Sequence, residues 1–266
     1  SMIQNLIVII PAIGLLCYSF LLLTLLPAKK GKIINAFIGI LVASIFWTGG
    51  SMCMRLLLAP GTNFRFQISI IGLFALPYVF YSFIHAFVEA KGYFLKNLFR
   101  GLTLVIILLN FFGVFLKAPK VITFSNSNPQ FIYSMEWPIA IVAIFTVLVI
   151  IAILSIMTKE IKKNYLYDGR LNPIIVGMFV LFLGNMANLI PGVSSTSFDI
   201  IAGIVNGVIV FYALYKRRLF TLTLLANRST TYIIATSIVA LVFAYLINPI
   251  ESLIETRFSP LYPFKT

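Results

Sequence analysis

The sequence predicts an all-α fold: a polytopic membrane helix bundle with a seven-helix core, an eighth transmembrane helix and an amino terminus outside. Two observations lead to this prediction. The chain of 266 residues is 61% hydrophobic and only 10% charged, whereas about 25% of the residues in a soluble domain are charged. Its apolar residues also gather into eight long stretches that contain no Asp, Glu, Lys or Arg.

Each of the eight stretches is a candidate for one transmembrane helix, because roughly 17–25 apolar residues cross the hydrocarbon core of a bilayer. In chain order they are Ile3–Leu26, Ile33–Met54, Phe66–Ile84, Gly101–Leu116, Trp137–Thr158, Leu171–Phe198, Ile200–Tyr215 and Ser229–Ile250. The fourth and the seventh are short and need a flanking turn to span. We assign residues 1–225 to the seven-helix core, and residues 226–266 to the eighth helix and a short tail.

The loops between these stretches differ in their content of basic residues. The four odd-numbered loops together hold 14 Lys and Arg residues, and the three even-numbered loops hold 4. Basic loops are retained in the cytoplasm. The asymmetry therefore predicts an external amino terminus and a seventh helix that ends inside. The longest external loop, Lys117–Glu136, is rich in Asn, Ser and Pro, which favour turns over regular structure.

Composition also bears on partners and cofactors. The net charge of +13 would suit nucleic acid, but the basic residues lie between apolar stretches, so membrane lipids are the expected partners and nucleic acid is not. Cys17 and Cys53 are isolated, and His85 is the only histidine. We therefore expect no metal site. No phosphate-binding or nucleophile motif is found, and we expect no cofactor and no catalytic residue.

Polar residues near the outer ends of the predicted helices form a candidate ligand site. Ionisable groups in or near a bilayer are costly, which makes them functional candidates. Five candidates share a predicted depth on the external side: Arg55, Glu136, Asn185, Asn188 and Asp199. Trp47, the sixth, lies deeper in the second predicted helix. Together they would line an outward-facing pocket. The alternative is that they are interfacial anchors, since Trp, Tyr and charged residues gather at membrane interfaces.

His85 and Glu89 form a second candidate pair near the inner end of the third helix. At a spacing of four residues they would share one helix face. A His–Glu pair there is able to relay a proton or sense pH. The alternative is a histidine satisfied by a local partner at the end of the helix.

The seventh helix has features of a signal-transmitting element. Gly203 and Gly207 form a small-xxx-small pair that permits close helix approach, with Asn206 between them. The helix then runs into Lys216, Arg217 and Arg218, which would hold anionic headgroups. The alternative is a static helix with an ordinary topology anchor.

Several local patterns resemble a known family. They are Trp47 followed by Gly49 and Gly50, the segment from Gly72 to Pro77, the segment Ile190–Gly192, and the helix exit Tyr215–Phe220. These resemble the seven-helix membrane sensor region at the amino terminus of bacterial histidine kinases and diguanylate cyclases. The similarity covers roughly Ile3 to Leu225. The chain departs from the pattern at Thr221, where an acidic residue is usual.

The resemblance implies a sensor or receptor module of a bacterial two-component system in the plasma membrane. Such a module would bind a small-molecule, peptide or lipid ligand from the external side or the bilayer. It would signal to a cytoplasmic output domain, in cis or on a partner protein, with a homodimer among the expected arrangements. The chain has no kinase or cyclase motif, so we expect it to be a piece of a longer protein, for example a sensor histidine kinase.

Two other functions compete with a sensor. A small-solute transporter or channel would need a polar path through the membrane, and the predicted helices carry few polar residues and no mid-membrane charge. An intramembrane enzyme acting on lipid would need a reactive cluster at one depth. With one histidine and seven acidic residues, mostly in loops, this is the weakest of the three.

Overall fold

The fold is described here from a computed structural model. It describes residues 2–55, 62–118, 120–122, 130–132, 136–163, 169, 171–187 and 198–216. The chain divides into two compact units, Ser1–Thr221 and Leu222–Thr266, and all described residues belong to the first. The predicted eighth helix lies outside the described residues, and the boundary at residue 225 stays a prediction.

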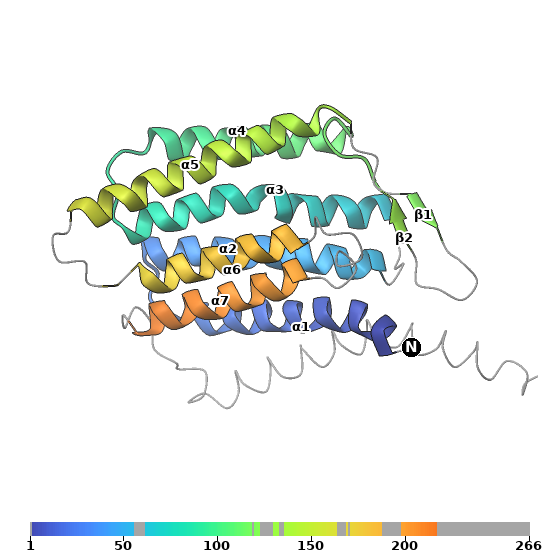
Figure 1. The fold of residues 1–266 in the computed structure, drawn as a ribbon, viewed down its shortest axis with the longest axis horizontal. Coiled ribbons are helices and arrows are strands. Elements are labelled where there is room, and N and C mark those ends of the chain that lie inside the picture. The colour runs from blue at the N-terminus through green and yellow to red at the C-terminus, as the bar shows by residue number, and fades with distance from the viewer. Residues whose placement is uncertain are drawn as a thin grey trace, which may run out of the picture. The chain divides into compact units, whose positions relative to one another are not determined.

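The described unit contains seven α-helices, so the helical class of the prediction is confirmed (Figure 1). Their bounds are α1 Met2–Leu25, α2 Lys32–Arg55, α3 Thr62–Phe87, α4 Phe94–Phe111, α5 Ile139–Lys163, α6 Asn172–Ala187 and α7 Phe198–Lys216. Among the described residues, four helices are long and apolar enough to cross a membrane: α2, α3, α4 and α5. Shorter apolar segments lie in α1, α6 and α7.

The loop between α4 and α5 corrects one expectation. Its composition favoured turns, but two short strands pair in it, β1 (Lys120–Ile122) with β2 (Gln130–Ile132). They are antiparallel, with Val121 opposite Phe131. The Asn, Ser and Pro residues lie between the strands, so turn composition indicated a connection and missed the β-branched and aromatic residues that flank it.

The helices α2 and α3 form the tightest pair, and the others pack around them. Helix α1 lies on α2, while α4 and α5 both pack on α3. Helix α7 packs between α6 and α1 (Figure 1). Buried side chains of α5 recur every three or four residues, from Val142 to Met157. Its other face is apolar and exposed, for example Ile144, as expected of a helix that faces lipid.

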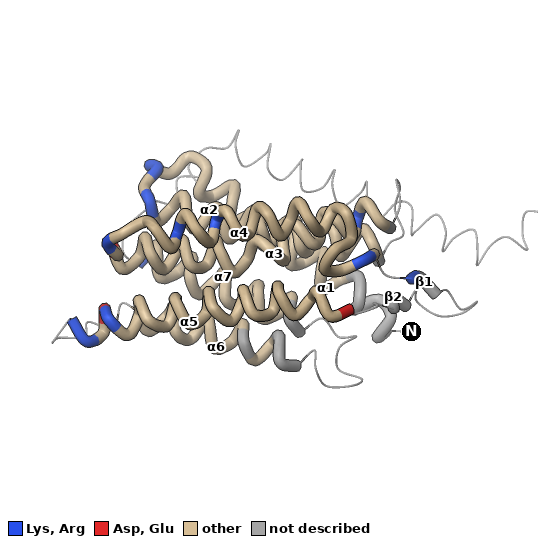
Figure 2. The backbone as a smooth tube through the Cα atoms, turned by 90° about the horizontal axis from the view of Figure 1, so that it is seen from above, with Lys and Arg blue, Asp and Glu red and all other residues tan. Residues whose placement is uncertain are grey.

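Successive helices run in alternating directions, so α1, α3, α5 and α7 end on one side (Figure 1). Most of the described Lys and Arg residues lie at this end (Figure 2). The structure thus brings the basic odd-numbered loops together. The side of the membrane that this end faces stays a prediction.

We expect the end that carries Lys91 to face the cytoplasm and the end that carries Lys117 to face outside, because of the loop asymmetry. Lys91→Cys and Lys117→Cys, each in a background without Cys17 and Cys53, place one thiol on each side. A membrane-impermeant maleimide applied to intact cells should label position 117 and leave position 91 unlabelled until the cells are opened. Labelling of position 91 in intact cells would invert the topology.

Candidate functional site

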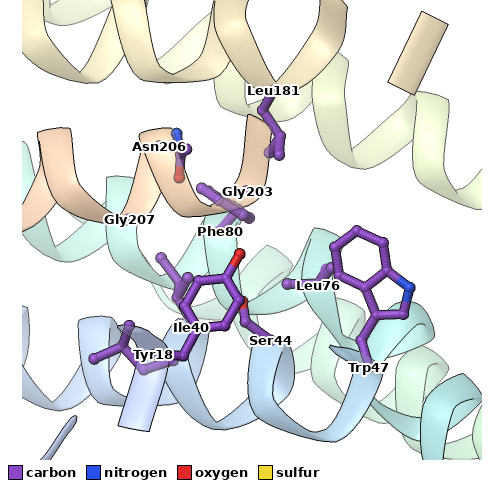
Figure 3. A pocket seen from close by; sticks show the side chains of 11 residues that line it. Tyr18, Ile40, Ser44, Trp47, Leu76, Phe80, Leu181, Gly203, Asn206 and Gly207 are labelled. Atoms are coloured by element: carbon purple, nitrogen blue, oxygen red, sulfur yellow. The ribbon is translucent and has the colours of Figure 1, made fainter. Parts of the chain in front are cut away.

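Buried polar side chains converge between α1, α2 and α7. Tyr18 of α1, Ser44 and Thr48 of α2 and Asn206 of α7 are all at most 5% exposed. Trp47 lies beside them, with Gly203 and Gly207 opposite Tyr18 (Figure 3). Polar groups are expensive in an apolar interior unless they are satisfied. Their concentration within an otherwise hydrophobic bundle makes this the candidate site, hereafter the polar cluster.

A small cavity lies within the polar cluster. Its volume is about 20 Å³, and its lining includes Tyr18, Ser44, Trp47 and Asn206. This is enough room for one water molecule. Within the described part of the chain, Asn206 Nδ2 has no hydrogen-bond partner. A buried donor left without a partner costs about 1–3 kcal/mol. In Figure 3 this amide nitrogen points away from Tyr18, and the amide oxygen of Asn206 lies on the side of the cavity. A hydrogen-bond donor that entered the cavity would therefore meet that oxygen.

Glycines set how closely α7 approaches its neighbours. A Cβ at Gly203 would collide with the Tyr18 hydroxyl, and one at Gly207 would lie 3.4 Å from Tyr18 Cε1. On the other side of α7, a Cβ at Gly177 of α6 would lie 2.7 Å from Asn206 Nδ2. Gly203 and Gly207 therefore let α7 pack closely on the Tyr18 ring of α1. Gly177 of α6 leaves room for the Asn206 amide of α7. These contacts involve side chains, which are able to adjust.

The contact between α2 and α3 is of a different kind. A Cβ at Gly72 would strike the carbonyl oxygen of Ala43 and the backbone nitrogen of Trp47. A Cβ at Gly50 would lie 2.5 Å from the backbone nitrogen of Ser69. Backbone contacts leave no room for adjustment. Ser69 Oγ also donates a hydrogen bond of 3.0 Å to the Trp47 carbonyl. The close contact of α2 with α3 therefore fixes the backbone position of Trp47.

The predicted residues divide between this cluster and other places. Trp47, Gly203, Asn206 and Gly207 meet in the polar cluster. Lys216 ends α7 and is exposed. The side chains of Arg55, Asn185 and Asp199 lie outside the described residues, as do Asn188, Arg217 and Arg218 as a whole. The predicted external pocket therefore stays a prediction.

Glu136 is described, and it lies at an exposed position. Its Oε1 is 3.4 Å from Lys117 Nζ, and both side chains are 59% exposed. Helix α5, which follows it, packs on α3. An exposed ion pair of this kind contributes about 0–1 kcal/mol. The position favours an interfacial role for Glu136 over a buried contact with a ligand.

The helical pairing of His85 with Glu89 needs correction. Helix α3 ends at Phe87, and Glu89 has a φ of 53°. The chain has therefore left the helix before Glu89, and the four-residue spacing no longer places the two side chains on one face. His85 is buried, and its Nε2 lies 2.7 Å from the Gly92 carbonyl oxygen. The described geometry thus gives the histidine a local partner in the α3–α4 loop.

Sequence reasoning missed two residues with unusual positions. Tyr18 is 1% exposed in the middle of an apolar helix, and a hydroxyl in such a segment was the available signal. Arg65 is one of the 4 basic residues assigned to the even-numbered loops, yet it lies in α3 and is 5% exposed. Its Nη1 donates a hydrogen bond of 2.8 Å to the Cys53 carbonyl. An uncharged-stretch criterion has no way to find a buried arginine.

The sequence of the chain matches one known protein family. The family described as the N-terminal 7TM region of histidine kinase matches residues 6–223. The chain belongs to this family. The match spans all seven described helices except the first residues of α1, which confirms the resemblance drawn from local patterns and a membrane location. No curated protein and no solved structure matches the chain.

Proposed function

We propose that the chain is the membrane sensor module of a bacterial histidine kinase in the plasma membrane. It binds a ligand that arrives from the external side or from the bilayer. The binding event changes the packing of α7, whose inner end leads to a cytoplasmic kinase domain. Family membership supports the sensor class. The ligand and the route of transmission are inferred from the polar cluster.

One observation supports the proposal: α7 is held by side-chain contacts, whereas α2 and α3 are held together by backbone contacts. One wall of the polar cluster is the rigid α2–α3 pair, and the other is a helix held by Tyr18 and Asn206 side chains. A ligand shifts an equilibrium only through differential contact with two states. A polar atom bound at Asn206 would favour one packing of α7 over another. The adjustable side-chain contacts of α7 allow this, whereas the backbone contacts of α2 with α3 do not.

In this proposal, the residues predicted near the outer helix ends form the entrance through which the ligand reaches the polar cluster. Arg55 ends α2 and Asp199 lies in the first turn of α7, so both are on helices that contribute to the polar cluster. We propose that they, with Asn185 and Asn188, receive the ligand above Trp47. Lys216, with Arg217 and Arg218 after it, would then hold the inner end of α7 at headgroup level.

Asn206→Leu tests the proposal in a fusion of this chain to the catalytic core of a histidine kinase. Leucine removes the buried unsatisfied amide, so we expect the free energy of unfolding to rise by about 1–3 kcal/mol. The melting temperature should rise with it. We also expect basal autophosphorylation to change about fivefold or more, the usual range of allosteric coupling. The measurements are thermal unfolding of the purified protein and autophosphorylation in membranes.

Thr103→Val is the matched control. Thr103 is also buried and its hydroxyl has no partner among the described residues, but it lies on α4, away from the polar cluster. Its removal should leave the output unchanged. If Asn206→Leu alters output no more than Thr103→Val at equal expression, α7 does not transmit through this site.

A further inference from the structure

An open pocket of about 720 Å³ lies where α2 and α4 begin. It is formed by two loops that are far apart in sequence, the α1–α2 loop and the α3–α4 loop. Five lysines line it, together with one carboxylate: Lys29, Lys30, Lys32, Lys91, Lys96 and Glu89. The site proposed for the ligand above does not include these residues, and we call this the lysine pocket.

Tyr93 organises the lysine pocket. Lys32 Nζ donates a hydrogen bond of 3.1 Å to the Tyr93 hydroxyl and lies 5.8 Å from the centre of its ring. Lys96 Nζ lies 5.7 Å from the same centre. The hydrogen bond from Lys32 and the charges of Lys32 and Lys96 lower the pKa of Tyr93. One aromatic ring thus brings together two ammonium groups from the first turns of α2 and α4.

The fold of the α3–α4 loop fixes this arrangement. His85 Nε2 is 2.7 Å from the Gly92 carbonyl oxygen, and the histidine ring lies 5.3 Å from the Tyr93 ring. Because His85 is buried in α3, it anchors the loop that presents Tyr93. Gly92 has a φ of 87°, a conformation that favours glycine. The fold of the α3–α4 loop therefore fixes the position of Tyr93 in the lysine pocket.

The charges of the lysine pocket are poorly balanced. Lys30 donates to the carbonyls of Leu25 and Leu26 and so caps α1. Among the described residues, no ion pair joins the other four lysines to Glu89. The first turns of α2 and α4 also contain no acidic residue, so the positive ends of two helix dipoles add to the field of the lysines. An anion would relieve this repulsion.

We propose that the lysine pocket binds a phosphate-bearing anion, held chiefly by Lys32 and Lys96 and supported by Lys29 and Lys91. Phosphate offers several acceptor oxygens to converging ammonium groups. Phe94 and Leu95, which lie between the pocket residues Tyr93 and Lys96 in the sequence, are 78% and 44% exposed. Exposed apolar residues next to lysines are typical of the membrane interface. This favours the headgroup of an anionic phospholipid as the source of the phosphate.

Native mass spectrometry of the purified protein with added phosphatidylglycerol tests the proposal. We expect a bound lipid that phosphatidylcholine does not displace. Lys32→Gln with Lys96→Gln should weaken binding about 10- to 30-fold, since each lysine near an anionic surface contributes about a fivefold effect. Lys159→Gln with Lys162→Gln removes two exposed charges at the same end of the bundle, outside the pocket, and should change binding by less than about twofold.

A second arm titrates inorganic phosphate by calorimetry into delipidated protein. Phosphate binding that is lost in the Lys32/Lys96 variant, without lipid binding, would support a soluble phosphate source. If neither probe binds, or if both lysine pairs reduce binding equally, the proposal is overturned. Thermal unfolding reports whether each variant is folded. Should the Lys32/Lys96 variant fail to fold, Lys29→Gln with Lys91→Gln must weaken binding more than Lys159→Gln with Lys162→Gln does, or the proposal fails.

Discussion

Gly72→Ala is expected to remove most of the thermal stability of the chain. The new Cβ would strike the Ala43 carbonyl oxygen and the Trp47 backbone nitrogen of α2. Overpacking usually costs about 1–3 kcal/mol and occasionally more, and we expect the upper end or beyond because the obstacle is backbone. Helices α2 and α3 form the tightest pair of the unit, so their separation disturbs every helix that packs on them. Thermal unfolding in detergent measures the effect.

The matched control is Gly101→Ala in α4, where a Cβ would meet nothing within 4 Å. That substitution should be neutral, or should raise the stability by up to about 1 kcal/mol through helix propensity. Gly50→Ala, which meets the backbone of Ser69, should behave like Gly72→Ala. Equal melting temperatures for the Gly72 and Gly101 variants would contradict the backbone contact between α2 and α3.

Gly203→Ala is expected to change signalling output with little loss of stability. Its Cβ would collide with the Tyr18 hydroxyl, while the next atom of that ring would be 3.7 Å away. Only the Tyr18 side chain is in the way, so a small shift of α7 against α1 relieves the collision and the bundle stays folded. In the kinase fusion we expect basal autophosphorylation to change about fivefold or more, with a melting temperature close to that of the wild type.

The same collision predicts a specific rescue. Tyr18→Phe removes the hydroxyl, so the methyl group added at position 203 would make only ordinary van der Waals contact with the ring in the double variant. Gly203→Ala combined with Tyr18→Phe should therefore return output toward that of Tyr18→Phe alone. Residues in contact commonly couple by about 0.5–3 kcal/mol. Additive effects of the two substitutions would show that Tyr18 and Gly203 do not act through one contact.

Hydrophobic patterning predicted the helices well, because a bilayer requires long apolar segments. The same patterning placed some helix ends wrongly, because it stopped each helix at the first charged residue. The charge-free rule began the fourth helix at Gly101, but α4 begins at Phe94 and includes Lys96 and Arg100. Long basic side chains extend from a helix end to the headgroups. A helix is therefore able to continue through charges that a composition rule treats as loop.

The candidate site was predictable in part. Gly203, Asn206, Gly207 and Trp47 stood out by residue type, and the structure brings them to one cavity. The partners of α7 were not predictable, because sequence spacing does not say which helices touch. Tyr18 faces Gly203 only because α7 packs on α1. The helical spacing assumed for His85 and Glu89 was wrong for a local reason: the helix ends two residues after His85, and Glu89 lies beyond it. Both residues still line one pocket, and their functional role stays a prediction.

The central claim, that α7 moves against a fixed α2–α3 pair, is tested most directly by a distance measurement. Spin labels at Asn35→Cys in α2 and Lys216→Cys at the end of α7 both occupy exposed positions. The background lacks Cys17 and Cys53, and pulsed electron paramagnetic resonance gives the interspin distance. We predict that Gly203→Ala shifts the distance distribution and that Tyr18→Phe restores it together with output. Identical distributions in variants whose output differs would contradict the account.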